Sequence, residues 1–118
     1  MKHDIGKRLA AALISRKYKQ GRDVLEVVVP DGPTLNCCLG VLTRLAIEDG
    51  VDLAVGMLPS GTMSFGGESH VLHPKVREWA GMKSDCGKYG DGWLVSDNDR
   101  GRPFEEIAQI VLDNLDDL

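Results

Sequence analysis

The spacing of apolar residues along the chain predicts three helices. Apolar positions recur every three to four residues in residues 5–14, 38–46 and 104–115, which is the period of one helical face. Asp4 stands where the first helix would take its N-cap, and Gly50 follows the second helix, where a C-terminal stop is expected. These helices would form the two ends and the middle of the chain.

Shorter patterns between the helices predict strands and turns. The β-branched run DVLEVVV, residues 23–29, is the clearest strand, and residues 51–58 and 62–67 flank a PSG loop as in a β-hairpin. Residues 74–80 begin with proline and are followed by glycine, which predicts a short helix. The run WLVS, residues 93–96, predicts a last short strand, and the polar residues after it predict a turn.

This order of elements predicts an α+β fold, in which a small, mostly antiparallel sheet packs with an N-terminal helix, a central helix and a C-terminal helix. The chain of 118 residues has the length of a single domain, 1–118, and can bury a core without a disulfide or a metal. No stretch has the length and apolarity of a membrane span, and no signal peptide is recognisable. We therefore expect a cytoplasmic protein with no membrane partner.

The adjacent pair Cys37-Cys38 raises the question of a reactive or metal-binding site. On a helix the two side chains diverge by about 100°, so they are poorly placed to share one tetrahedral ion. We expect both to be small buried residues at the start of the central helix, which Thr34 or Asn36 would cap. Gly40 lies in the same helix, and a glycine at such a position indicates that another backbone approaches closely.

Charge is distributed unevenly along the chain. Residues 1–22 contain seven basic residues and one acidic residue, a balance of +6, whereas residues 23–118 contain seven basic and seventeen acidic residues, a balance of −10. The overall charge of −4 disfavours non-specific binding of nucleic acid, because phosphate repulsion acts over the whole surface. The basic N-terminal segment can still hold a small anion.

The motifs of the common hydrolytic classes are absent. The sequence has no Gly-x-Ser-x-Gly, no His-Glu-x-x-His and no phosphate-binding loop that ends in Lys-Ser or Lys-Thr. Asp97 and Asp99 could still act as an acid–base pair or bind a divalent ion. His70, His73 and Cys86 could contribute to a zinc site together with one of the paired cysteines. We favour a protein with no catalytic residues, no metal and no cofactor.

Two polar segments combine side chains that bind phosphates and rings. YKQGR, residues 18–22, follows the first helix, and SDNDRGR, residues 96–102, precedes the last helix. Both lie at junctions between elements, where loops carry binding residues on a rigid scaffold. Arginine grips phosphate with two parallel hydrogen bonds, and tyrosine stacks on bases. The predicted ligand-binding residues are Tyr18, Gln20, Arg22, Asn98, Arg100 and Arg102.

Several stretches also resemble a known group of sequences. YKQGR, CCLGVL and the C-terminal pattern DND…FEEIAQI are similar to those of small tailed-phage and prophage proteins. More distantly, the size and layout of the chain resemble the phage anti-defence sponge proteins that counter Thoeris and related systems. Those sponges are homo-oligomers that sequester a cyclic nucleotide signal, such as a cyclised ADP-ribose, without cleaving it.

The resemblance and the polar segments together predict a non-enzymatic, phage-encoded protein in the host cytoplasm that sequesters a small nucleotide-derived immune signal. Tyr18 would stack on a base, Gln20 and Asn98 would contact base or ribose edges, and the arginines would hold phosphates. The wide apolar stripes of the first and last helices predict a homo-oligomer, because uncovered apolar faces usually mark interfaces. The alternatives are an adaptor or inhibitor that binds a host protein, and a small metal-dependent hydrolase.

Overall fold

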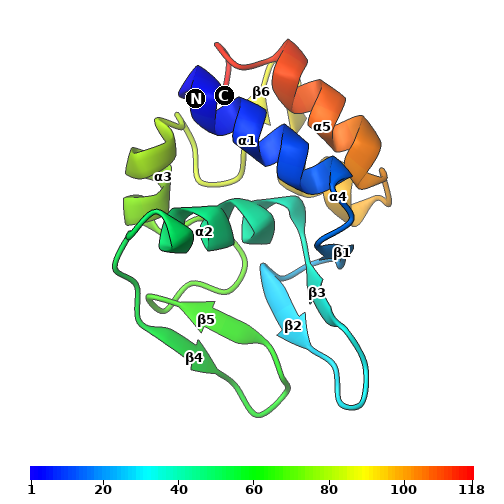
Figure 1. Ribbon diagram of the computed structural model, residues 1–118. Coiled ribbons are helices and arrows are strands. Elements are labelled where there is room, and N and C mark those ends of the chain that lie inside the picture. Colours follow the sequence, from blue (N-terminus) through cyan, green and yellow to red (C-terminus); the bar gives the residue numbers. More distant parts are fainter.

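The computed structural model describes residues 1–118 as helices gathered at one end of the molecule and two β-ribbons at the other (Figure 1). The helices are α1 (His3–Ile14), α2 (Cys38–Glu48), α3 (Pro74–Ala80), α4 (Leu94–Asp99) and α5 (Phe104–Asp113). The strands are β1 (Lys19–Gln20), β2 (Glu26–Val28), β3 (Thr34–Asn36), β4 (Val55–Met57), β5 (Met63–Phe65), β6 (Lys88–Tyr89) and β7 (Gly92–Trp93). The predicted α+β class, with small and mostly antiparallel sheets, is confirmed.

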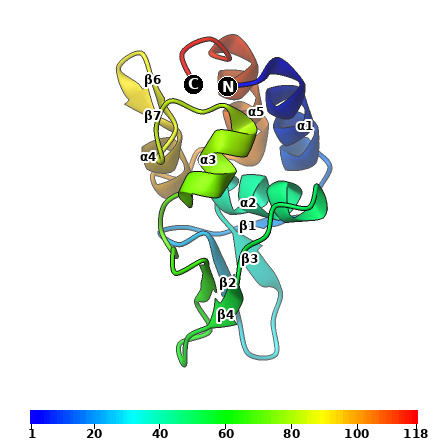
Figure 2. The ribbon, with the colours of Figure 1, turned by 90° about the vertical axis from the view of Figure 1, so that its left-hand side faces the viewer.

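The strands form three short sheets. β3 lies between β1, to which it is parallel, and β2, to which it is antiparallel. The hairpin of β4 and β5 joins this sheet where Val28 N donates to Gly61 O at 2.8 Å, next to an isolated bridge between Val27 and Thr62. Figure 2 shows these ribbons projecting from one side of α2, whereas the β6–β7 hairpin lies near α4 among the helices.

The core lies between α1, α2 and α5. α1 and α5 pack along each other in opposite directions: the amino group of Met1 donates to Leu115 O at 3.1 Å, near the end of α5. Leu9 and Ile107 are fully buried between these helices and α2. The buried apolar side chains of the whole chain form one continuous cluster. No helix is long and apolar enough to cross a membrane.

Several local predictions are confirmed. α3 begins at Pro74 and is followed by Gly81, which has the left-handed conformation (φ 66°) of a helix C-cap. Residues 55–65 form the predicted hairpin. Gly40 lies against another backbone, as its position indicated: a Cβ atom there would overlap the carbonyl oxygen of Leu25. The central helix can therefore rest directly on the backbone segment that leads into β2.

Other predictions of elements are wrong. Thr34 and Asn36 do not cap α2, because they belong to β3, and Cys37 takes the N-cap position. Asp4 lies within the first turn of α1, and Lys2 is the N-cap. Residues 93–99, predicted as a strand and a turn, form the end of β7 and the whole of α4. The strand predicted over residues 23–29 is reduced to Glu26–Val28.

Candidate functional site

The two polar segments singled out in the sequence lie side by side in the fold. Gln20, on β1, donates from Nε2 to Arg102 O at 2.7 Å and to Asn98 Oδ1 at 3.1 Å. Asp23 N donates to Asp99 Oδ1 at 2.9 Å, just beyond the end of the first segment. The junction between α1 and β1 is thereby joined to the junction between α4 and α5.

Asn98 joins the two segments through the hydrogen bonds of its buried side chain. Its side chain is fully buried on α4, and its Oδ1 accepts from Cys38 N at 3.2 Å as well as from Gln20. Its Nδ2 donates to Gly21 O at 2.8 Å. Asn98 therefore satisfies a free backbone N–H at the start of α2 and fixes the β1 segment. The predicted role of Asn98 as a ligand contact does not fit this burial.

Arg102 is engaged in a network of side chains with Asp97 and Glu106. Its Nε lies 3.3 Å from Asp97 Oδ1, and its Nη1 lies 3.4 Å from Glu106 Oε2. The hydroxyl of Tyr89 donates to the other carboxylate oxygen of Asp97. Burial and this hydrogen bond raise the pKa of Tyr89 to about 12, so the phenol stays protonated at neutral pH. Arg102 and Asp97 are thus partners of each other.

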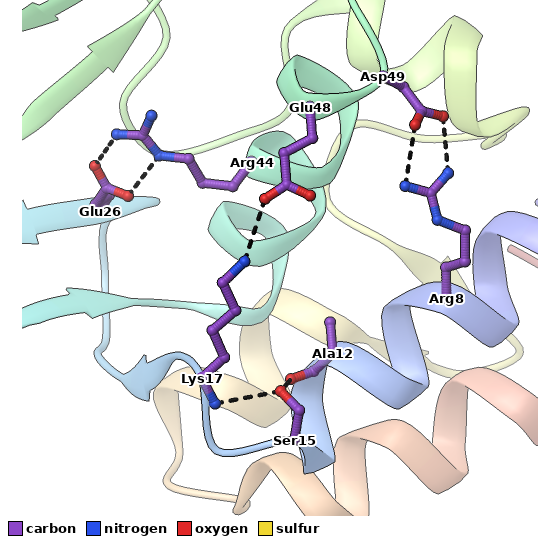
Figure 3. Close-up of polar contacts among 8 residues, drawn as sticks. All are labelled: Arg8, Ala12, Ser15, Lys17, Glu26, Arg44, Glu48 and Asp49. Atoms are coloured by element: carbon purple, nitrogen blue, oxygen red, sulfur yellow. Dashed lines mark hydrogen bonds and ion pairs between the residues drawn. The ribbon is translucent and has the colours of Figure 1, made fainter.

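Arg8, Arg44 and Arg77 also have partners. Arg44 donates from Nε to Glu26 Oε1 at 2.8 Å and from Nη2 to Glu26 Oε2 at 2.5 Å (Figure 3). Arg8 donates from Nη1 to Asp49 Oδ2 at 2.8 Å and from Nη2 to Asp49 Oδ1 at 3.1 Å. Arg77 donates to two backbone carbonyls beyond the end of α3. Figure 3 also shows Lys17 reaching Glu48 from the segment that follows α1.

Three arginines form no ion pair and no side-chain hydrogen bond, and we call them the arginine rim: Arg16, Arg22 and Arg100. All three are exposed and lie at the two joined junctions. The guanidinium of Arg22 reaches the α4–α5 turn, where a Cβ atom on Gly101 would lie 2.8 Å from Nη2. The glycine therefore leaves room for the arginine to cross from one junction to the other.

A shallow depression of about 270 Å³ opens beside this rim. Tyr18 is half-buried at its wall, and Lys17 Nζ lies 5.4 Å from the centre of the tyrosine ring. Other depressions of similar size exist on the surface, but this one combines an aromatic ring with an arginine that has no partner. Its lining residues are Leu13, Arg16, Tyr18, Lys19, Gln20, Phe104 and Glu105.

The sequence identified part of this surface and missed the rest. Tyr18 and Gln20 line the depression, whereas Arg22 and Arg100 lie on the joined segments outside its lining. Arg16 and Lys19 were not singled out, although the basic excess of residues 1–22 was a signal for both. Arg16 adopts a left-handed conformation (φ 65°), which turns the chain between α1 and β1.

The adjacent cysteines, Cys37 and Cys38, are small buried residues, whereas Cys86 is partly exposed. Cys38 begins α2 and is fully buried, and Cys37 is nearly so. Burial raises the pKa of Cys37 to about 11 and raises the pKa of Cys38 well above its ordinary value. Neither thiol is a ready nucleophile at neutral pH. No group of three or more histidine, cysteine, aspartate and glutamate side chains gathers closely enough to hold a metal ion.

Comparison with known proteins places the chain in a family. Residues 1–115 match the family model DUF8296, described as a domain of unknown function, so the chain belongs to this family. That description names no catalytic activity. No significant match is found among curated proteins or among solved structures.

Proposed function

We propose that this DUF8296 protein is a non-enzymatic binding protein for a small, phosphate-bearing, nucleotide-like ligand. The observation that carries the proposal is the arginine rim, Arg16, Arg22 and Arg100, which forms no ion pair, together with the depression in which Arg16 lies beside Tyr18. A folded protein commonly engages its arginines with carboxylates or carbonyls, as Arg44 and Arg77 are engaged here. Guanidinium groups that have no protein partner are available to a ligand.

The chemistry of these side chains suits a nucleotide. An arginine fork forms two hydrogen bonds with a phosphate, and such charge-assisted bonds contribute roughly 1.5–3 kcal/mol each. A tyrosine ring stacks on a base for about 1–3 kcal/mol. Because Tyr18 is half-buried, its orientation is held before the ligand arrives, and less conformational entropy is lost on binding.

We further propose that the ligand is a cyclic nucleotide-derived immune signal, held intact by a phage protein in its host. The support is the resemblance of the sequence to phage proteins and the kind of side chains at the site. The depression offers two cations, Arg16 and Lys19, and the ring of Tyr18, whereas the Cys37 thiol and the Tyr89 phenol, whose pKa values are raised, do not line it. Such a site binds an anion without supplying an activated nucleophile.

Calorimetric titration with a panel of linear and cyclic nucleotides tests the proposal. Arg22→Ala and Arg100→Ala should each weaken binding about tenfold to a hundredfold, which corresponds to the loss of one charge-assisted contact. Arg22→Lys and Arg100→Lys should recover part of the loss, because lysine keeps the charge without the fork. Lys88→Ala is the matched control. It removes an exposed positive charge on the β6–β7 hairpin and should leave the affinity for the nucleotide unchanged.

Mass spectrometry of the bound ligand separates sequestration from catalysis. After heat denaturation of the complex, a ligand released with unchanged mass supports sequestration, and a product of altered mass assigns an enzymatic activity instead. If no nucleotide in the panel binds, or if both arginine-to-alanine variants bind like the parent, the proposed site is wrong.

A second candidate function, an adaptor that binds a host protein, is favoured by the apolar surface of the β4–β5 hairpin. The exposed fractions of Val55, Met57 and Leu58 are 44%, 64% and 48%. An exposed apolar ribbon of this kind suits a protein partner. An adaptor would ignore the nucleotide panel and would capture one host protein, and Met57→Asp would abolish that capture while Arg22→Ala would not.

A further inference from the structure

The outer faces of α1 and α5 form a groove that the single chain leaves uncovered. Each helix contributes four residues at positions i, i+3, i+4 and i+7, the spacing of one helical stripe. The groove has a volume of about 340 Å³. We call it the α1–α5 groove; its residues are Lys7, Ala10, Ala11 and Ile14 on α1, and Glu105, Ala108, Gln109 and Leu112 on α5.

The side chains of the groove are arranged like half of a helix bundle. Three alanines line its floor, so a second pair of helices can approach closely. Ile14 and Leu112 stand at its two ends with exposed fractions of 54% and 40%. Apolar knobs beside small-residue holes are the complementary parts of knobs-into-holes packing.

Two charged residues mark opposite ends of the groove. Because α1 and α5 are antiparallel, Lys7 shares one end with Leu112, and Glu105 shares the other end with Ile14. Neither Lys7 nor Glu105 forms an ion pair within the chain. Among the residues that line the groove, the one cation and the one carboxylate therefore lie at opposite ends, with three alanines and Gln109 between them.

We propose that a second copy of this chain occupies the α1–α5 groove and forms a two-fold symmetric, four-helix dimer. A surface with opposite charges at its two ends is complementary to itself when the copy is turned end for end. With the two-fold axis running across the groove, each end combines Lys7 of one copy with Glu105 of the other. An axis along the groove would instead gather two Lys7 side chains at one end and two Glu105 side chains at the other.

Light scattering after size-exclusion chromatography gives the first test. The parent protein at micromolar concentration should have twice the 12.8 kDa mass of one chain. Ala11→Glu places a charged side chain on the floor of the groove and should raise the dimer dissociation constant at least about tenfold. Ala54→Glu is the matched control, since Ala54 is also exposed but precedes β4 on the other side of the molecule. Circular dichroism melting verifies that both variants are folded.

A charge exchange tests the orientation of the two copies. Lys7→Glu alone and Glu105→Lys alone should each weaken the dimer about tenfold, because every end would then hold two like charges. The double variant Lys7→Glu/Glu105→Lys should restore the affinity of the parent, because opposite charges meet again. Rescue by the second substitution is not expected from a merely local effect on either helix.

Three outcomes would overturn the proposal. A parent protein that stays monomeric at tens of micromolar excludes a stable dimer. A dimer that persists in a folded Ala11→Glu variant but is lost in Met57→Asp places the interface on the β4–β5 hairpin. A double charge variant that is as weak as the single variants excludes the two-fold arrangement across the groove.

Discussion

The polar side chains inside the fold and the arginines on its surface come from the same short segments. They differ in that the inner side chains have hydrogen-bond partners and the surface arginines do not. Gln20 and Asn98 have partners for their side-chain amides, and Asn98 is fully enclosed. Arg22 lies two residues after Gln20, and Arg100 lies two residues after Asn98. Neither arginine forms an ion pair or a side-chain hydrogen bond. The amides of Gln20 and Asn98 join the two segments, whereas the guanidinium groups of Arg22 and Arg100 remain available to a ligand.

This difference shows why proximity to a candidate site is poor evidence of a binding role. The amides of Gln20 and Asn98 could contact a base in chemical terms, but their hydrogen bonds already connect α2, β1 and the α4–α5 turn. Free hydrogen-bonding capacity, rather than residue type, separates the arginine rim from its neighbours. The comparison predicts that substituting a buried side chain that has partners lowers the free energy of unfolding strongly, and that substituting an arginine of the rim hardly changes it.

The largest expected effect is that of Asn98→Ala. The substitution leaves Cys38 N and Gly21 O buried without partners and removes one acceptor of Gln20. The free energy of unfolding should fall by about 3 kcal/mol, since each unsatisfied buried group costs about 1–3 kcal/mol. Urea unfolding followed by circular dichroism measures the change.

Asn114→Ala provides the control for this prediction. Asn114 is half-buried and donates only to Ile110 O, so its loss should cost less than half as much. If the two substitutions lowered the free energy of unfolding equally, the hydrogen bonds of Asn98 between the segments would contribute no more than the single bond of Asn114.

Arg44→Ala should have the next largest effect. The side chain of Glu26 is only 5% exposed and would lose both hydrogen bonds to Arg44. Removing one partner of a buried ion pair is strongly destabilising, and because Arg44 itself is partly exposed we expect a loss of about 2 kcal/mol. Arg8→Ala, which breaks the more exposed pair with Asp49, should cost less than about 1 kcal/mol in the same unfolding experiment.

The Glu26–Arg44 pair should also make stability depend on pH. Burial acts to raise the pKa of Glu26, but hydrogen bonds from Arg44 and Asn36 outweigh it and hold the pKa below its ordinary value. A lowered pKa in the folded state gives stability that is present above the ordinary glutamate pKa and is lost as the pH falls through the folded value. The stability difference between the parent and Glu26→Gln should therefore shrink on acidification, as measured by urea unfolding from pH 7 downward. A difference that stays constant with pH would contradict this assignment.

The smallest expected effect is that of the rim. Arg22→Ala and Arg100→Ala should change the free energy of unfolding by less than about 0.5 kcal/mol, because neither side chain has a partner to lose. Thermal and urea unfolding of both variants measure this. A loss above about 1 kcal/mol in either one would show that the arginine supports the fold, as Arg44 does.

The sequence predicted the long amphipathic elements well because their apolar spacing is regular. α1, α2 and α5 fall close to their predicted positions, and the close backbone contact at Gly40 was indicated by the glycine alone. α4 was mistaken for a strand and a turn because its buried positions are Leu94, Asp97 and Asn98. These have helical spacing, but two of the three are polar, and an apolar pattern cannot reveal them.

The candidate site was predicted in outline only. The two polar segments were expected to act together, and hydrogen bonds from Gln20 and Asp23 do join them. Which side chains remain free after the segments meet depends on tertiary partners that no local pattern specifies. For that reason Asn98 and Arg22 looked equivalent in the sequence, although one is enclosed and the other is exposed.

The pairing of α1 with α5 has a consequence for the synthesis of the protein. The ribosome produces α1 well before α5, the helix that packs along it, and the bond from Met1 N to Leu115 O spans 114 residues. Asn98 reaches back 77 residues to Gly21 in the same way. During translation the apolar stripe of α1 therefore stays exposed until nearly the whole of residues 1–118 has been made. Nascent chains arrested before α5 should need a chaperone to remain free of aggregation, whereas released chains should fold without one.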